Sequence, residues 1–154
     1  MKKNIDSQRN WDLFYLEVAK TVSLKSKDPS TKVGAVLARK NRSLISVGFN
    51  GFPQAMPDKS DFYLDRKEKY SRIIHAEMNA LIYSENKNLK ESTLYTWPFS
   101  ACDRCFVVMV QAGVERFVAP KPPELLQEVW TNSFLKVKEY ANECNVELVE
   151  LDFE

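Results

Sequence analysis

The feature that most constrains the fold of this chain is the relation between its single histidine and a pair of cysteines. His75 opens the run His75-Ala76-Glu77, and Cys102 and Cys105 follow it later in the chain. One imidazole and two thiols are the protein ligands that a catalytic zinc takes when its fourth position stays open to water. If the three side chains bind one ion, the chain must fold so that these two segments meet.

Each half of the pattern also has a simpler explanation. An isolated histidine is usually a surface or hydrogen-bonded core residue, and a Cys-x-x-Cys pair can be a redox dithiol or half of a structural zinc site. A four-thiolate site is excluded because Cys144 is the only other cysteine. A redox dithiol would leave His75 and Glu77 without a role. The combination therefore predicts a metal site.

The positions of these residues relative to predicted helices set a further condition. Cys102 and Cys105 fall at the start of one helix, where unpaired N–H groups and the helix dipole favour thiolates. His75 falls at the start of another. Residues i and i+2 of a regular helix point about 200° apart, so His75 and Glu77 can share a site only if His75 lies at the cap or in the first turn. Glu77 would then move protons for a zinc-bound water; the alternatives are that it binds the metal or supports a ligand.

Hydrophobic periodicity predicts an alternation of strands and helices. Predicted helices cover 10–25, 74–85, 103–112 and one or two segments within 124–144, and Asn10 is the expected N-cap of the first. Predicted strands cover 33–38, 44–49, 93–96, 114–119 and 146–151. Residues 39–43 predict a hairpin turn, Gly113 a left-handed helix stop, and 50–72 a long irregular connection. Crossovers of ten or more residues indicate an α/β domain whose later strands pair in parallel, and residues 1–154 are expected to form one domain.

Composition favours a small-molecule substrate over nucleic acid. The chain has 22 Lys and Arg against 21 Asp and Glu, a net charge of +1, whereas nucleic-acid binders usually carry a basic excess. Residues 1–6 are polar and predict no signal peptide, and no window is apolar enough to span a membrane. Three cysteines, two of them at the metal site, fit the cytoplasm, and Cys144 is expected to be a small buried hydrophobic residue.

A His-x-Glu run followed by Pro-Cys-x-x-Cys is the signature of zinc nucleobase deaminases. The run His75-Ala76-Glu77-Met78-Asn79-Ala80-Leu81 resembles, more narrowly, the zinc helix of deoxycytidylate (dCMP) deaminases within the cytidine deaminase-like superfamily. The blocks Ser26–Gly34, Gly48–Pro53 and Gln111–Val114 resemble that family's blocks in the same order. The resemblance covers about residues 10–119.

The resemblance implies zinc-dependent hydrolytic deamination of dCMP to dUMP, a precursor of thymidylate. It implies a three-layer α/β/α sandwich with a five-stranded mixed sheet. It also implies a homo-oligomer, usually a hexamer, whose activity rises with dCTP and falls with dTTP.

The predicted substrate contacts are Asn50, Ala76, Lys27 and Ser26. Asn50 matches the asparagine that holds the sugar hydroxyl in this superfamily, and Lys27 with Ser26 lies where the nucleotide phosphate is expected to bind. The simpler interpretations are a turn residue beside Gly51 for Asn50 and a solvated side chain for Lys27.

Two departures from the family pattern bear on the site. Ala101 stands where family members usually have proline before the first cysteine, and the segment from Trp97 to Cys102 is about one residue longer, in a loop that borders the expected pocket. Several relatives bind a second, structural zinc through the long connection, but residues 51–74 contain neither His nor Cys. We therefore expect one zinc per subunit.

Other residues have an interpretation in packing beside the functional one. Trp97, Phe99 and Phe52 could stack on a base or pack in the core, and the mixed charges of residues 58–69 are expected to form a solvated surface.

Three other functions are compatible with the same motifs. One is a deaminase of another cytosine compound, such as dCTP, cytidine or a modified dCMP. Another is a non-catalytic zinc-containing nucleotide-binding protein, although Glu77 argues against it. The third is a polynucleotide deaminase, which the near-neutral charge disfavours.

Overall fold

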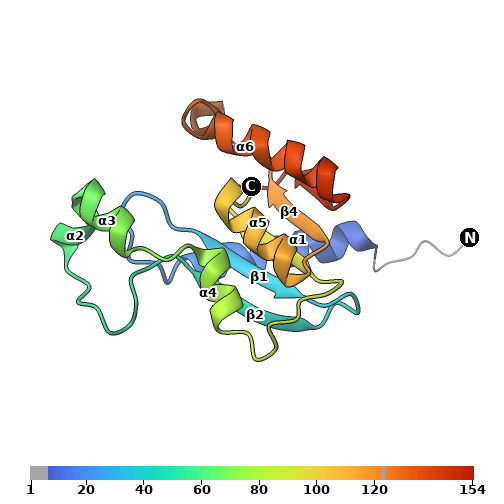
Figure 1. Cartoon of the computed structure of the whole chain (residues 1–154), viewed down its shortest axis with the longest axis horizontal. Coiled ribbons are helices and arrows are strands. Elements are labelled where there is room, and N and C mark those ends of the chain that lie inside the picture. The colour runs from blue at the N-terminus through green and yellow to red at the C-terminus, as the bar shows by residue number, and fades with distance from the viewer. Residues whose placement is uncertain (1–6, 123) are drawn as a thin grey trace, which may run out of the picture.

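The computed structural model of the chain describes residues 7–122 and 124–154, with backbone alone for residues 125–131. Five strands form one sheet in the order β2-β1-β3-β4-β5 (Figure 1). The strands are β1 (Gly34–Ala38), β2 (Leu44–Phe49), β3 (Thr93–Trp97), β4 (Arg116–Pro120) and β5 (Glu147–Leu151). The helices are α1 (Gln8–Ser23), α2 (Ser60–Leu64), α3 (Arg66–Arg72), α4 (Ala76–Ile82), α5 (Asp103–Ala112) and α6 (Glu124–Cys144).

Strand direction follows from the length of each connection. The short turn between β1 and β2 makes that pair antiparallel, and β1 is also antiparallel to β3. The crossovers through α5 and α6 make β3, β4 and β5 parallel, since parallel neighbours need a long connection. The predicted mixed five-stranded sheet is confirmed.

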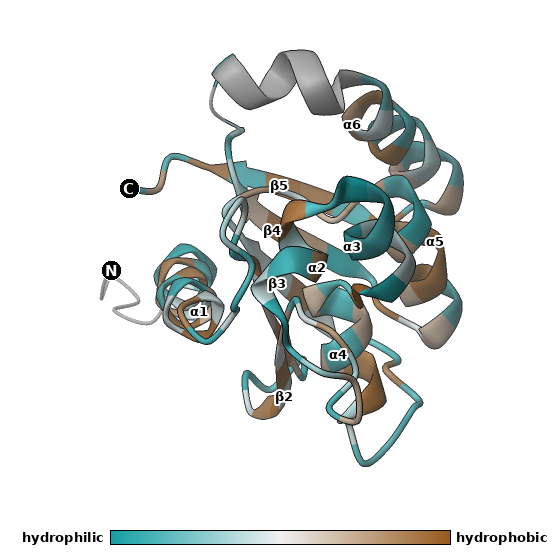
Figure 2. Ribbon diagram, turned by 90° about the vertical axis from the view of Figure 1, so that its left-hand side faces the viewer, coloured by the Kyte–Doolittle hydropathy of each residue, from teal (hydrophilic) through white to brown (hydrophobic). Residues whose placement is uncertain are grey.

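The sheet lies between two helical layers, with α1 on one face and α4, α5 and α6 on the other (Figure 2). Ala35 and Leu37 of β1 pack in the cluster beneath α4 and α5, whereas Val36 and Ala38 pack against α1. A strand covered on both faces reads as a continuous apolar run, which explains the sequence of β1. The three-layer prediction is confirmed.

Three local predictions are wrong. Ser7, not Asn10, caps α1: its side chain accepts a hydrogen bond from the Asn10 amide at 3.3 Å, so Asn10 lies inside the helix. The connection over 50–72 contains the short helices α2 and α3, and Asp65 caps α3. Cys144 is the last residue of α6 and is exposed rather than buried: it follows the buried Val137 and Ala141 at helical spacing, but the end of the helix leaves it uncovered.

Two glycines are required by the backbone around the site. A Cβ on Gly48 would lie 2.4 Å from the Ala76 oxygen and the Ala80 nitrogen, so only glycine lets β2 approach the backbone of α4 this closely. Gly113 ends α5 with φ of 113°, which confirms the predicted left-handed stop and is a conformation that side chains disfavour.

In the described ranges, no helix combines the length and the apolar character needed to cross a membrane. The polar residues 1–6, and with them the predicted absence of a signal peptide, lie outside these ranges.

Candidate active site

His75 occupies the N-cap of α4, with extended backbone angles (φ −67°, ψ 153°). Backbone hydrogen bonds in both directions between Gly51 and Ile74, 3.1 and 2.8 Å long, hold the residues before it extended. The helix then begins at Ala76, so Glu77 lies in its first turn. The prediction that His75 lies at the cap is confirmed, and the irregular backbone there removes the angular conflict between His75 and Glu77.

Cys102 occupies the equivalent position at the start of α5. Its sulfur accepts a hydrogen bond from the Cys105 backbone amide at 3.5 Å and thereby caps the helix. The next amide, that of Asp103, donates to the Ser133 hydroxyl of α6 at 3.0 Å. Packing of α6 against α5 therefore fixes the turn that presents both sulfurs.

The three predicted ligands converge. Nδ1 of His75 lies 3.6 Å from the Cys102 sulfur and 3.3 Å from the Cys105 sulfur. A tetrahedral zinc bonded to nitrogen and sulfur at ordinary lengths separates those atoms by about 3.6 Å. The three side chains are thus positioned to bind a metal ion, and in residues 7–122 and 124–154 no other group of three or more such side chains is so placed.

The charges of the two thiols are linked. The hydrogen bond with Cys105 lowers the pKa of Cys102 to about 4, and the same contact raises the pKa of Cys105. The hydrogen bond with Cys102 raises the pKa of His75. One thiolate shared by two sulfurs beside an imidazole is an environment suited to a cation, which would favour loss of the second thiol proton.

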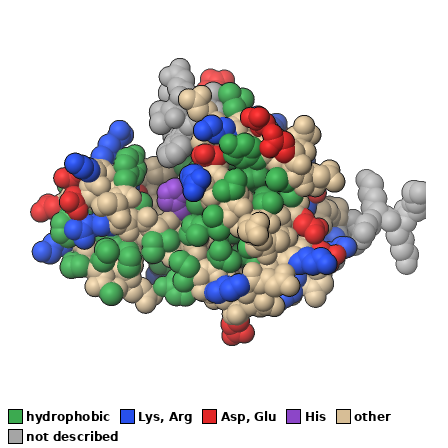
Figure 3. All heavy atoms as spheres, viewed as in Figure 1, with side chains coloured by type: hydrophobic (Ala, Val, Ile, Leu, Met, Phe, Trp, Pro, Cys, Tyr) green, Lys and Arg blue, Asp and Glu red, His purple; other side chains and the backbone are tan. Residues whose placement is uncertain are grey.

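Glu77 lies behind the three ligands. It is 4% exposed, and burial raises its pKa above the usual glutamate value. Its carboxyl group also shares a hydrogen bond with Cys105. A raised pKa favours the protonated carboxyl group, and a carboxyl group that can gain and lose a proton is what general acid–base catalysis requires. His75, in contrast, reaches the molecular surface (Figure 3, purple), so the metal position is open to small molecules.

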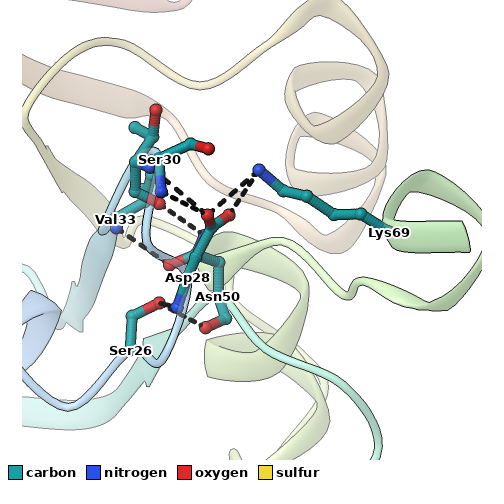
Figure 4. A network of polar contacts seen from close by, with 7 residues as sticks. Ser26, Asp28, Ser30, Val33, Asn50 and Lys69 are labelled. Atoms are coloured by element: carbon teal, nitrogen blue, oxygen red, sulfur yellow. Dashed lines mark hydrogen bonds and ion pairs between the residues drawn. The ribbon is translucent and has the colours of Figure 1, made fainter. Parts of the chain in front are cut away.

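Asn50 lies beside the metal position, because the residue after it pairs with the residue before His75. Its Oδ1 accepts from the Val33 amide at 2.9 Å and its Nδ2 donates to the Thr31 oxygen at 2.9 Å (Figure 4). The hydroxyl of Ser26 donates to the Asn50 backbone oxygen at 2.9 Å. Asn50, directly after β2, is thus bound to the loop between α1 and β1.

The other two predicted substrate residues differ in exposure and in what they contact. Ala76 is fully buried at the start of α4. The Lys27 side chain is 66% exposed and pairs with Asp58 at 2.6 Å. The structure therefore brings Asn50 and Ala76 next to His75, whereas Lys27 points to the connection before α2.

Sequence reasoning missed the ion pair between Asp28 and Lys69. The Lys69 ammonium lies 2.8 Å from the buried Asp28 carboxylate. The predicted solvated surface over residues 58–69 is therefore wrong at Lys69. Asp28 could have been noticed in the turn sequence Asp28-Pro29-Ser30, but nothing distinguishes Lys69 from neighbouring lysines.

The three aromatic candidates all have packing partners. Phe52 stacks on Tyr63, with ring centres 4.0 Å apart, and Phe99 packs against Phe134 of α6. Trp97 packs at the edge of the cluster beneath α1.

A cavity of about 330 Å³ lies where β1 ends and β3, β4 and β5 begin, at the opposite end of the strands from these residues. Arg39 and Arg42 of the first turn line it, together with Ser92 and Arg116 at the starts of β3 and β4. It is distinct from the metal position, which lies where β2 and β3 end.

Comparison with known proteins agrees with this geometry. The sequence pattern described as "Cytidine and deoxycytidylate deaminase zinc-binding region" matches residues 9–121. An "uncharacterized deaminase in luxG 3'region" of Aliivibrio fischeri is 31% identical over 138 residues, covering 90% of this chain and 91% of that protein.

Two further relatives have names that state a substrate. A "probable deoxycytidylate deaminase" of Caenorhabditis elegans is 38% identical over 106 residues, 66% of this chain and 53% of that protein; the chain thus matches about half the length of the worm protein. The dCMP deaminase of cyanophage S-TIM5, solved with dCMP and dUMP, superposes with a TM-score of 0.71 at 23% identity, covering 94% of this chain and 99% of that one, a likeness in fold. By its zinc-ligand geometry and its match over residues 9–121, the chain belongs to the zinc-binding cytidine and deoxycytidylate deaminase family.

Proposed function

We propose that the protein catalyses the zinc-dependent hydrolysis of dCMP to dUMP and ammonia. The observation that supports this most directly is the placement of Glu77 behind His75, Cys102 and Cys105 at two adjoining helix starts. Relatives named deoxycytidylate deaminases support the choice of nucleotide. Water supplies the oxygen that forms the new bond at C4 of cytosine, and the bond from C4 to the amino nitrogen breaks.

The residues at the metal position have separate roles in this reaction. His75, Cys102 and Cys105 would hold the zinc, one ion per subunit, which when bound lowers the pKa of water towards neutrality. Glu77 takes one proton released by water and passes it to the ring nitrogen N3; it then takes the second proton, from the new hydroxyl at C4, and gives it to the departing amine, which leaves as ammonia. The raised pKa of Glu77, caused by burial, suits a group that must both accept and return a proton.

Substrate contacts follow from the residues around the metal position. Asn50 is proposed to bind the sugar hydroxyl through Oδ1, which accepts one hydrogen bond from Val33 and keeps a second lone pair. Ala76 is proposed to contact the base beside Glu77. Lys27 is proposed to contact the phosphate, in competition with Asp58, with Ser26 adjoining it.

The assembly and its regulation are part of the same proposal. We expect a single-domain subunit in a homo-oligomer, hexameric by resemblance, that responds to dCTP and dTTP and works in the cytoplasm. Exposed apolar side chains on the edge strand β2, Leu44, Val47 and Phe49, offer a surface for subunit contact. Three free cysteines fit a reducing compartment.

The test is a deamination assay of zinc-loaded protein with dCMP, CMP, dCTP, cytidine and deoxycytidine, each with and without added dCTP or dTTP. The proposal expects the highest kcat/KM with dCMP and a change in activity with the triphosphates. Preference for another compound would reassign the substrate. Nucleotide binding without ammonia release would favour a non-catalytic protein.

A further inference from the structure

Asp28 is the centre of a buried polar network outside the metal site (Figure 4). Its side chain is 2% exposed. Oδ1 accepts from the Ser30 amide at 2.9 Å and the Thr31 amide at 3.4 Å. Oδ2 accepts from the Lys69 ammonium at 2.8 Å and from Asn50 Nδ2 at 3.4 Å. One carboxylate therefore joins the loop after α1, the end of β2 and helix α3.

The pair of Asp28 with Lys69 differs from the other ion pairs of this region. Lys69 is only 12% exposed, whereas Lys27 is 66% exposed in its pair with Asp58. Exposed pairs contribute little because water and salt screen them. A shielded pair keeps its geometry. This one joins the loop after α1 to α3, the helix that directly precedes the segment leading into His75.

The network fixes which way the Asn50 amide faces. An amide nitrogen has two hydrogens, and those of Asn50 go to the Thr31 oxygen and to Asp28. Oδ1 accepts from the Val33 amide and retains one lone pair. Asn50 can therefore offer a ligand an acceptor and no donor. An acceptor selects a group that donates, such as a hydroxyl.

We infer that Asp28 and Lys69 are positioning residues for nucleotide binding, because they hold the Asn50 amide with Oδ1 as the acceptor for the sugar hydroxyl. The inference rests on the proposed function, and it assigns to the pair a contribution to substrate affinity rather than to proton transfer. Without Lys69 the carboxylate is free to turn towards water, and the Asn50 amide loses the charged one of the three partners that orient it, keeping Val33 and Thr31.

The test compares Lys69→Met with Lys67→Met, which removes the same charge from an exposed position of the same helix. Lys69→Met is expected to raise KM for dCMP by roughly 10-fold or more, the equivalent of one hydrogen bond to a charged group, with kcat and zinc content close to wild type. Lys67→Met is expected to leave KM unchanged, and Lys69→Arg to restore most of the affinity. Asp28→Asn tests the pair from its other side if Lys69→Met is poorly folded.

A substrate without the hydroxyl separates positioning from general destabilisation. With 2′,3′-dideoxycytidine monophosphate, which lacks the 3′-hydroxyl, the ratio of KM between Lys69→Met and wild type is expected to fall towards one. The inference would be overturned if this ratio equalled the ratio measured with dCMP, or if Lys69→Met left the KM for dCMP unchanged. In either case turnover of dCMP by the wild-type protein would still support the proposed function. If the wild-type protein released no ammonia from dCMP, the proposed function itself would fail.

Discussion

Two buried carboxyl groups, Glu77 and Asp12, differ in the partners that surround them. Burial raises the pKa of Glu77, and no cationic side chain pairs with it among the ion pairs of the described residues. Burial also acts to raise the pKa of Asp12, but hydrogen bonds from Arg116, Gln8 and Tyr95 outweigh it and leave that pKa lowered. Glu77 is therefore suited to exchanging a proton, and Asp12 to keeping a permanent charge.

Replacing Glu77 tests its assignment as the residue that transfers protons. Glu77→Gln keeps the size of the side chain but removes its proton exchange, so kcat for dCMP should fall by roughly 10²- to 10⁴-fold. Zinc content and the unfolding temperature should stay near wild type. The control is Glu85→Gln, at an exposed position shortly after the end of α4. Wild-type turnover in Glu77→Gln would rule out the assigned role.

Asp12 predicts how stability depends on pH. A lowered pKa in the folded state stabilises the protein above the unfolded-state value of about 3.9, and that contribution is lost as pH falls through the folded-state pKa. Asp12→Asn should therefore destabilise the protein at pH 7, and its difference from wild type should shrink below about pH 4. Urea unfolding at several pH values measures this, with the exposed Glu17→Gln as control; a difference that does not change with pH would contradict the prediction.

At the scale of elements, the site depends on where two helices begin. His75 and Cys102 are the N-caps of α4 and α5, and both N-cap positions are set by contacts elsewhere: the pairing of Gly51 with Ile74, and the bond from Asp103 to Ser133. Helix starts favour anionic ligands, which fits the thiolate of Cys102. Displacing either helix should therefore change metal binding before it changes the rest of the fold.

Gly48→Ala tests this dependence. Its Cβ would collide with backbone atoms of Ala76 and Ala80 at 2.4 Å, so α4 must move. We expect a loss of about 1–3 kcal/mol in the free energy of unfolding and weaker zinc retention against a chelator. Gly51→Ala is the matched control, since nothing lies within 4 Å of its added Cβ, and its stability should change by about 0.5 kcal/mol or less. Equal effects of the two substitutions would contradict the prediction.

The limits of sequence reasoning are clearest among these elements. Hydrophobic periodicity predicted all five strands and the helices that cover the sheet, because each has a buried face that leaves a repeating pattern. It missed α2 and α3, whose short polar turns bury little apart from Tyr63. It misplaced the cap of α1 because Ser7 and Asn10 are both good N-cap residues. Cys144 was misjudged because residue type alone does not show that the last turn of α6 is left uncovered.

In the whole molecule, the topology brings the site residues together. His75, Cys102 and Cys105 meet beyond the carboxyl ends of β2 and β3, a common place for sites in open α/β sheets. Spacing in the sequence was enough to predict that His75, Cys102 and Cys105 come together. The partner of Asp28 was not predictable, because Lys69 lies 41 residues away and meets it only through the tertiary fold.

The measurement that tests the central claim most directly is zinc X-ray absorption spectroscopy on purified protein of known metal content. The account predicts one zinc per chain, bound by two sulfurs and one imidazole nitrogen with a further light-atom ligand from water. The bond lengths should be about 2.3 Å to sulfur and about 2.0–2.1 Å to nitrogen. Folded protein without tightly bound zinc, or a fourth ligand supplied by a side chain, would contradict it.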